Sequence, residues 1–141
     1  MRNTNWLAIA AAVVAGMAIG FLWYGALFQN QWMAGNGISM NGDITLKDGV
    51  EQPMSSMPMI ANTLAMVIYA IFMDWLIFKT NDTTWAKGAT LGLILGLVML
   101  VGVYVGNLFA MAPMSLSMVD GSYSLVLFTA MGAIIGGWRK K

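Results

Sequence analysis

Residues 87–110 read KGATLGLILGLVMLVGVYVGNLFA, and this stretch decides the fold. After Lys87 it contains no charged residue, and it exceeds the roughly 20 apolar residues that cross a bilayer as a helix. Its glycines recur at intervals of four residues, at Gly88, Gly92 and Gly96 and again at Gly102 and Gly106. Such spacing places glycines on one helix face, where a second helix can approach closely. The stretch therefore predicts a central, tightly packed transmembrane helix.

The composition of the whole chain is typical of a membrane protein. Of its 141 residues, 59% are hydrophobic and 9% are charged, whereas soluble domains have about 25% charged residues. The net charge of +1 argues against a nucleic-acid partner, which requires a basic patch. The chain has no Cys and no His, which excludes thiol catalysis, disulfides, Ser-His-Asp triads and nearly every zinc site. We expect no cofactor, with Cu(I) as the one alternative.

Four apolar segments predict an all-α fold, an integral membrane bundle of four transmembrane helices in one domain that covers residues 1–141. The predicted spans are residues 6–28, 58–78, 87–111 and 122–138. The long polar stretch at 29–57 is predicted to be an extracytoplasmic loop with several Gly-containing turns.

The positions of Lys and Arg predict that both termini lie in the cytoplasm. With a cytoplasmic N-terminus, six of the seven basic residues fall inside, and only Lys47 falls outside. This is the asymmetry that the positive-inside rule describes. The six inside residues are Arg2, Lys79, Lys87, Arg139, Lys140 and Lys141.

Glycine pairs spaced by four residues occur in the first and fourth spans as well. They are Gly16 with Gly20, and Gly132 with Gly136. Together with the glycines of the third span, these faces exceed what one small bundle needs for its own packing. The surplus predicts a homo-oligomer, or a contact with another membrane protein, within the lipid bilayer. The first functional hypothesis is therefore a non-enzymatic structural or accessory subunit.

Polar groups within the predicted spans give a second hypothesis, a small transporter or channel. Asp74 is the ionisable residue inside a predicted span, and an intramembrane carboxylate indicates a proton or cation site. The simpler alternative is that Asp74 snorkels to the nearby interface or pairs with Lys79 or Lys87. Asn62 and Asn107 either form hydrogen bonds between helices or join Asp74 in lining a polar cavity.

The tetrapeptide Asp120–Tyr123 is interpreted as a turn in front of the fourth span. In this interpretation Asp120-Gly121 forms the turn, Ser122 caps the helix and Tyr123 lies at the membrane interface. The chain contains no Walker loop, nucleophile elbow or carboxylate pair suited to acid–base work. We therefore predict no catalytic residue and no enzymatic activity.

The chain has 14 methionines, and two strings of them give a third hypothesis, extracytoplasmic Cu(I) binding. Thioethers are soft ligands that select Cu(I), and the strings are similar to the methionine motifs of copper-uptake proteins. The alternative is that these residues pack as flexible apolar groups at the interface. The candidate ligands are Met54, Met57, Met59, Met111, Met114 and Met118.

A set of short motifs is distributed along nearly the whole chain, apart from the 36–57 loop. They are Trp23-Tyr24 with Phe28 and Trp32, Gly88-Ala89 with Gly92, Asn107-Leu108-Phe109, Asp120–Tyr123, and Met131–Arg139. In this order and spacing they resemble a bacterial membrane family of unknown function, family 1761. The chain departs from that family at Gly25-Ala26, where Ser-Pro is usual. The resemblance implies a four-span protein of the bacterial cytoplasmic (inner) membrane and supplies no activity.

Overall fold

The computed structural model describes residues 4–81 and 83–138, and four long helices dominate it. They are α1 (Trp6–Leu22), α3 (Met57–Thr80), α4 (Trp85–Phe109) and α5 (Met114–Gly137). A π-helix, η1 (Trp23–Leu27), continues α1, and each of the four spans is long and apolar enough to cross a membrane. The predicted all-α, multi-pass membrane fold is confirmed.

Local sequence signals set the starts of the helices. The Asn5 side chain accepts a hydrogen bond from the Ala8 N–H at the start of α1. The Thr84 hydroxyl accepts one from the Lys87 N–H at the start of α4. Both side chains satisfy a backbone donor that has no partner within its helix. Pro58 lies in the first turn of α3, where its missing N–H costs nothing.

The fourth span begins earlier than predicted. α5 begins at Met114, directly after Pro113, and not at residue 122. Asp120 and Gly121 therefore lie inside the helix, and the predicted turn at these residues is wrong. Gly121 brings α5 close to α4, because a Cβ at this position would lie 2.9 Å from Leu100 Cγ.

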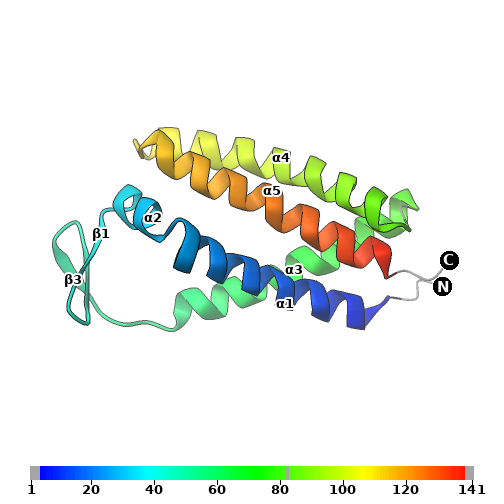
Figure 1. Cartoon of the computed structure of the whole chain (residues 1–141), viewed down its shortest axis with the longest axis horizontal. Coiled ribbons are helices and arrows are strands. Elements are labelled where there is room, and N and C mark those ends of the chain that lie inside the picture. The colour runs from blue at the N-terminus through cyan, green and yellow to red at the C-terminus, as the bar shows by residue number, and fades with distance from the viewer. Residues whose placement is uncertain (1–3, 82, 139–141) are drawn as a thin grey trace.

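α5 is the central helix of the bundle, since it contacts α1, α3 and α4 and has the most buried residues of the four long helices. Figure 1 shows α4 and α5 side by side along their lengths. Their closest approach is at glycines: Gly88 lies against the backbone of Gly132, and Gly92 lies against the Phe128 carbonyl. The contact continues at Gly96. Glycine thus allows backbone-to-backbone packing of this antiparallel pair.

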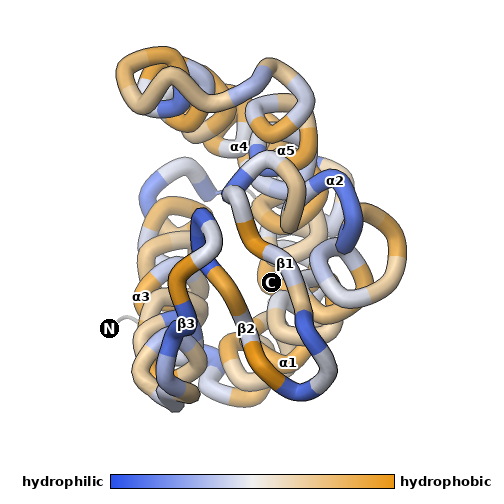
Figure 2. Tube along the Cα trace, turned by 90° about the vertical axis from the view of Figure 1, so that its left-hand side faces the viewer, coloured by the Kyte–Doolittle hydropathy of each residue, from blue (hydrophilic) through white to orange (hydrophobic). Residues whose placement is uncertain are grey.

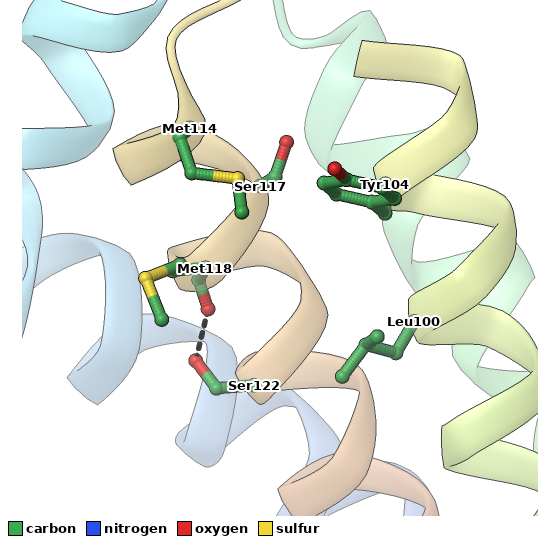
Figure 3. A pocket seen from close by; sticks show the side chains of 6 residues that line it. All are labelled: Leu100, Tyr104, Met114, Ser117, Met118 and Ser122. Carbon is green, nitrogen blue, oxygen red and sulfur yellow. Dashed lines mark hydrogen bonds between the residues drawn. The ribbon is translucent and has the colours of Figure 1, made fainter. Parts of the chain in front are cut away.

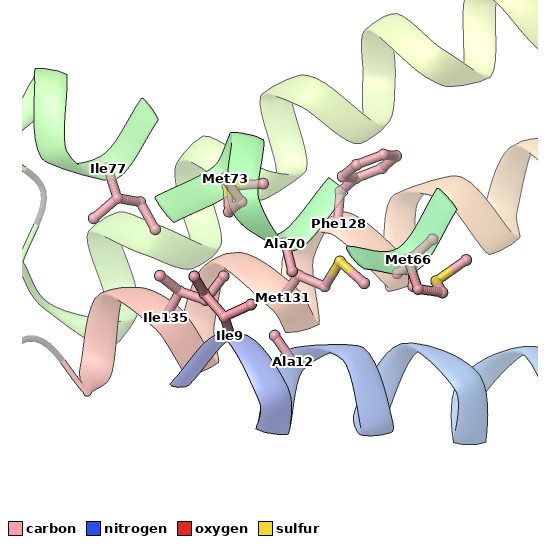
Figure 4. Packing of buried hydrophobic residues seen from close by; sticks show 10 residues of the cluster. Ile9, Ala12, Met66, Ala70, Met73, Ile77, Phe128, Met131 and Ile135 are labelled. Atoms are coloured by element: carbon pink, nitrogen blue, oxygen red, sulfur yellow. The ribbon is translucent and has the colours of Figure 1, made fainter. Parts of the chain in front are cut away.

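The hydrophobic core lies among α1, α3 and α5, as Figure 4 shows. Met131 of α5 is fully buried in it. A Cβ at Gly16 of α1 would lie 2.7 Å from the Met131 Cε, so this glycine makes room for the methionine. The largest fully buried hydrophobic side chains are Met73, Ile77, Leu127, Met131 and Ile135.

The predicted 29–57 loop is an ordered helix and sheet at one end of the bundle. Its elements are α2 (Gln29–Gly35), β1 (Ile38–Asn41), β2 (Ile44–Lys47) and β3 (Val50–Gln52). The strands form an antiparallel sheet in the order β1-β2-β3. Figures 1 and 2 show the sheet beyond the helix ends, with polar and apolar residues mixed along it. α2 packs on the start of α5, where a Cβ at Gly35 would lie 2.9 Å from Leu116 Cβ.

The start of α1 and the end of α5 meet at the opposite end of the bundle. Asn5 Nδ2 donates a hydrogen bond of 3.0 Å to the Trp138 carbonyl. Lys79 and Lys87, at the end of α3 and the start of α4, lie at this end, whereas Lys47 lies on the sheet (Figure 1). Which end faces the cytoplasm stays a prediction. The other basic residues on which it depends lie outside the described residues: Arg2, Arg139, Lys140 and Lys141.

Candidate functional site

η1 links the first span to α5 through two aromatic side chains. In a π-helix the hydrogen bonds join residues five apart, and such segments are frequent at functional sites. Phe28 N–H accordingly donates to the Trp23 carbonyl. Trp23 Nε1 donates to the Val119 carbonyl at 3.0 Å, and the Tyr24 hydroxyl donates to Asp120 Oδ1, also at 3.0 Å. η1 therefore directs two neighbouring side chains onto consecutive residues of α5.

Aromatic rings surround this junction. The Tyr123 ring centroid lies 4.9 Å from that of Tyr24 and 6.5 Å from that of Trp23. On its other side, Tyr24 lies 5.6 Å from Trp32 of α2. A Cβ at Gly20 would lie only 3.2 Å from the Tyr123 hydroxyl oxygen. Glycine at position 20 therefore leaves space for the tyrosine between α1 and α5.

A cavity of about 460 Å³ lies next to the Tyr24–Asp120 hydrogen bond, between α3, α4 and α5. This volume falls within the range of small-molecule sites. No Lys or Arg is among its described lining residues. The polar and aromatic residues of the lining are Tyr24, Tyr69, Asn107, Asp120, Tyr123, Ser124 and Phe128.

Asn107 leaves a donor available in the cavity. Its side chain interacts with the Asp120 carboxyl group. However, the buried Nδ2 completes no hydrogen bond with any described residue. A buried donor without a partner costs roughly 1–3 kcal/mol, so a ligand or a water that accepts its hydrogen bond would stabilise the site. Ser124, in contrast, donates to the Asp120 carbonyl at 3.1 Å.

The residues that form this cavity fall within the part of the chain that a family model matches. The model, described as "Protein of unknown function (DUF1761)", covers residues 7–136. The chain belongs to the DUF1761 family. This confirms the family resemblance drawn from the sequence motifs. Neither a curated protein nor a solved structure was found to match the chain.

The three polar residues predicted to line a pathway in this DUF1761 protein are not brought together. Asn107 lines the cavity, but Asp74 and Asn62 do not. Asn62 Nδ2 instead lies 3.4 Å from the Met17 sulfur, in a polar contact between α3 and α1. Asp74 is 0% exposed within the bundle, which does not fit the alternative that it snorkels to the interface, and the alternative that it pairs with Lys79 or Lys87 stays a prediction.

Asp120 and Tyr24 are the site residues of the DUF1761 chain that sequence reasoning missed. Asp-Gly is a typical turn signal, so the local sequence favours a turn over a helix at Asp120. Pro113 was the available signal, since proline is common at helix starts. A helix beginning there continues through Asp120. Nothing local identifies Tyr24, because its hydrogen-bond partner is 96 positions away in sequence.

The methionines predicted to bind Cu(I) lie on two separate strings. Met54 precedes α3, and Met57 and Met59 lie in its first turn. Met111 precedes α5, and Met114 and Met118 lie at its start. Figures 1 and 2 show these two helix starts on opposite sides of the same end of the bundle. Met114 and Met118 line a second hollow of about 260 Å³, and their thioethers point in different directions (Figure 3). One chain therefore does not join the two strings into one site, and Cu(I) binding stays a prediction.

The glycines predicted to pack helices divide into two groups. Gly102 and Gly106 are exposed, and a Cβ at either would meet nothing within 4 Å. Gly106 also borders the Asp120 cavity, whereas Gly102 does not line it. The other seven lie against neighbouring helices: Gly16, Gly20, Gly88, Gly92, Gly96, Gly132 and Gly136.

Proposed function

We propose that this DUF1761 protein is a non-enzymatic transporter or channel that takes up a small polar solute in the cavity beside Asp120. The observation that carries the proposal is the 3.0 Å hydrogen bond from Tyr24 to Asp120 on the wall of that cavity. Both residues lie in helices of membrane-spanning length. Ionisable groups in such helices are costly, and they usually mark the pathway of an ion or a substrate.

A purely structural role accounts for less of the site. Helix packing requires complementary faces, which the glycines of α4 and α5 supply. It gives no reason for a carboxylate, a buried amide and a π-helix to meet at one cavity. Asp120, Asn107 and Tyr24 come from three different elements, and their convergence supports solute binding.

We place the protein in the bacterial cytoplasmic membrane, with both termini in the cytoplasm. Lys79 and Lys87 at one end of the bundle, and Lys47 at the other, support this orientation. The Asp120 cavity then lies toward the extracytoplasmic side, where α5 begins. A solute would enter it from the side that α2 and the sheet cover.

Solid-supported-membrane electrophysiology on proteoliposomes tests the proposal. Wild-type protein, Asp120→Asn and Asp43→Asn are each given pulses of Na⁺, K⁺, protons and choline. We expect a current from at least one solute, abolished by Asp120→Asn. Asp43, an exposed residue of the β1–β2 turn, is the matched control, and its variant should retain the current. Wild-type protein that carries no current, or a current that Asp120→Asn leaves unchanged, contradicts the proposal.

Self-association through α4 is the second candidate function, that of a subunit in a homo-oligomer. Gly102 and Gly106 support it, because they are spaced by four residues and nothing in the described chain lies within 4 Å of a Cβ at either, although Gly106 also borders the Asp120 cavity. Native mass spectrometry of protein released from membranes measures the number of subunits. Gly102→Leu should lower that number, and Val98→Leu, at another exposed position of α4, should not. A monomeric wild type contradicts this candidate.

A further inference from the structure

We propose that the Asp120 cavity binds an organic ammonium cation, that is, a positively charged nitrogen bearing small apolar groups. The inference rests on the proposed function and adds the chemical class of its solute. Asp120 is the only carboxylate among the described lining residues, and no basic side chain accompanies it there. A carboxylate removed from water is stabilised by a cation, so the charge of the site selects a positive ligand.

The positive charge of the ligand would lie beside the second carboxylate oxygen of Asp120, Oδ2. The Tyr24 hydroxyl donates to Oδ1, and the Asn107 side chain also interacts with the carboxyl group. A carboxylate accepts several hydrogen bonds through its two oxygens. A cationic nitrogen can therefore approach the Asp120 carboxylate without displacing Tyr24.

The aromatic rings of the cavity suit the apolar groups on the nitrogen. Tyr24 and Tyr123 lie with ring centroids 4.9 Å apart, and Tyr69 and Phe128 lie 5.2 Å apart. All four line the cavity. Rings attract a cation through their negative faces, and aromatic groups beside a carboxylate are typical of sites for alkylated ammonium groups.

The cavity suits an organic cation better than a metal ion. Ca²⁺ binds six to eight oxygen atoms, and Mg²⁺ requires an octahedral set. The described residues contain no group of three or more acidic side chains that could hold a metal. The rest of the wall is largely apolar, with Met99, Val103 and Leu127 among its residues. A bare ion would leave most of the 460 Å³ unfilled.

An ammonium group can reach this site from water or from a phospholipid headgroup. α3 and α4 diverge from their shared turn, as Figure 1 shows, and the cavity draws residues from both. Either source supplies the same chemistry to Asp120 and the rings. Measurements in nanodiscs with and without phosphatidylethanolamine distinguish the two.

Isothermal titration calorimetry of the full chain in phosphatidylglycerol nanodiscs gives the direct test. Choline is compared with dimethylbutanol, its neutral carbon isostere, which keeps the shape and lacks the charge. We expect choline to bind at least about tenfold more tightly, because its positive charge, which the isostere lacks, is attracted to Asp120 and to the aromatic rings and adds roughly 1.4 kcal/mol or more. If choline binds more weakly in discs that contain phosphatidylethanolamine, the lipid headgroup competes for the site and is the natural ligand. If choline binds equally in both kinds of disc, the natural ligand is a free amine. Both results support the ammonium class.

Two pairs of variants assign the binding to this cavity. Asp120→Asn should lower choline affinity by about tenfold or more, because it removes the negative charge that attracts the ligand, and Asp43→Asn should leave it unchanged. Tyr69→Leu should lower it by about three- to thirtyfold, because a cation–π contact is lost, whereas Tyr69→Phe keeps the ring and should bind normally. The Tyr69 pair does not touch the Tyr24–Asp120 hydrogen bond, so it remains informative if Asp120→Asn fails to fold.

Equal binding of choline and the neutral isostere, or no binding of either, overturns the ammonium inference. So does a choline affinity that Tyr69→Leu leaves unchanged. If ammonium binding fails while proteoliposomes still show an Asp120-dependent current for protons, Na⁺ or K⁺, only the ligand class is wrong. If choline binds as expected but no current appears, the binding site is supported and the proposed transport function is contradicted.

Discussion

The Tyr24 hydroxyl donates a 3.0 Å hydrogen bond to Asp120 Oδ1 and so fixes the π-helix of the first span to the central helix α5. Trp23 forms a similar hydrogen bond, from its indole N–H to the carbonyl of Val119, the residue before Asp120 in α5. The two bonds hold one wall of the cavity in place. They make Asp120 part of a rigid junction and not a mobile surface carboxylate.

Removing the Tyr24 hydroxyl should destabilise the fold. Tyr24→Phe leaves a partly buried Asp120 oxygen without its donor, so we expect the free energy of unfolding to fall by about 1–3 kcal/mol. Tyr104→Phe is the matched control, since its hydroxyl forms no hydrogen bond with the described residues. Denaturation with sodium dodecyl sulfate in mixed micelles measures both changes. Equal losses in the two variants would show that the Tyr24–Asp120 bond contributes nothing.

The α4–α5 contact should not tolerate a methyl group at its closest point. Gly92→Ala places a Cβ against the Phe128 carbonyl, and we expect it to lower the free energy of unfolding by about 1–3 kcal/mol or more. Gly102→Ala adds the same methyl group at a position where nothing lies within 4 Å, so it should change the free energy of unfolding little. The same denaturation assay compares them. A Gly92→Ala protein as stable as Gly102→Ala would contradict the packing of α4 on α5.

The core among α1, α3 and α5 should depend on Met131. Its side chain is 0% exposed and fills the space beside Gly16, so Met131→Ala leaves a cavity. The expected loss in the free energy of unfolding is about 2–5 kcal/mol. Met54, which is 95% exposed, provides a Met→Ala control with little expected effect. Thermal unfolding followed by circular dichroism measures both variants. If Met131→Ala and Met54→Ala both melt at the wild-type temperature, the Met131 side chain does not stabilise the core.

Cysteine labelling should reveal the orientation, because the chain has no native Cys. Ser55→Cys lies between the sheet and α3, and Thr83→Cys lies in the α3–α4 connection at the other end. In intact cells a membrane-impermeant maleimide should label Ser55→Cys directly, and Thr83→Cys only after lysis. The reverse pattern would mean that both termini face outward.

Much of the fold follows from the sequence, because long apolar runs without charge have few alternatives to a transmembrane helix. The glycines at 88, 92 and 96 also indicated a helix contact. Their spacing could not show that Gly102 and Gly106 lie on another face with no partner in the described chain. A small-residue pattern identifies a face that can pack and does not identify what packs on it.

The site was less accessible to prediction than the fold. Asp120-Gly121 has the composition of a turn, yet the helix that begins at Met114 passes through it. Gly121 is required there by the approach of Leu100, a tertiary contact with no local signature. The π-helix at Trp23–Leu27 likewise has no recognised sequence signal, and it is stabilised by bonds to residues far along the chain.

Labelling of Asp120→Cys in native membranes tests the central claim most directly. If residue 120 faces a cavity between helices, this cysteine should react with a small aminoethyl methanethiosulfonate and only slowly with a bulky impermeant maleimide. Met54→Cys, on the exposed chain before α3, should react with both reagents rapidly. Rapid reaction of Asp120→Cys with the bulky maleimide, at the rate of Met54→Cys, would place residue 120 in an exposed turn and contradict the account.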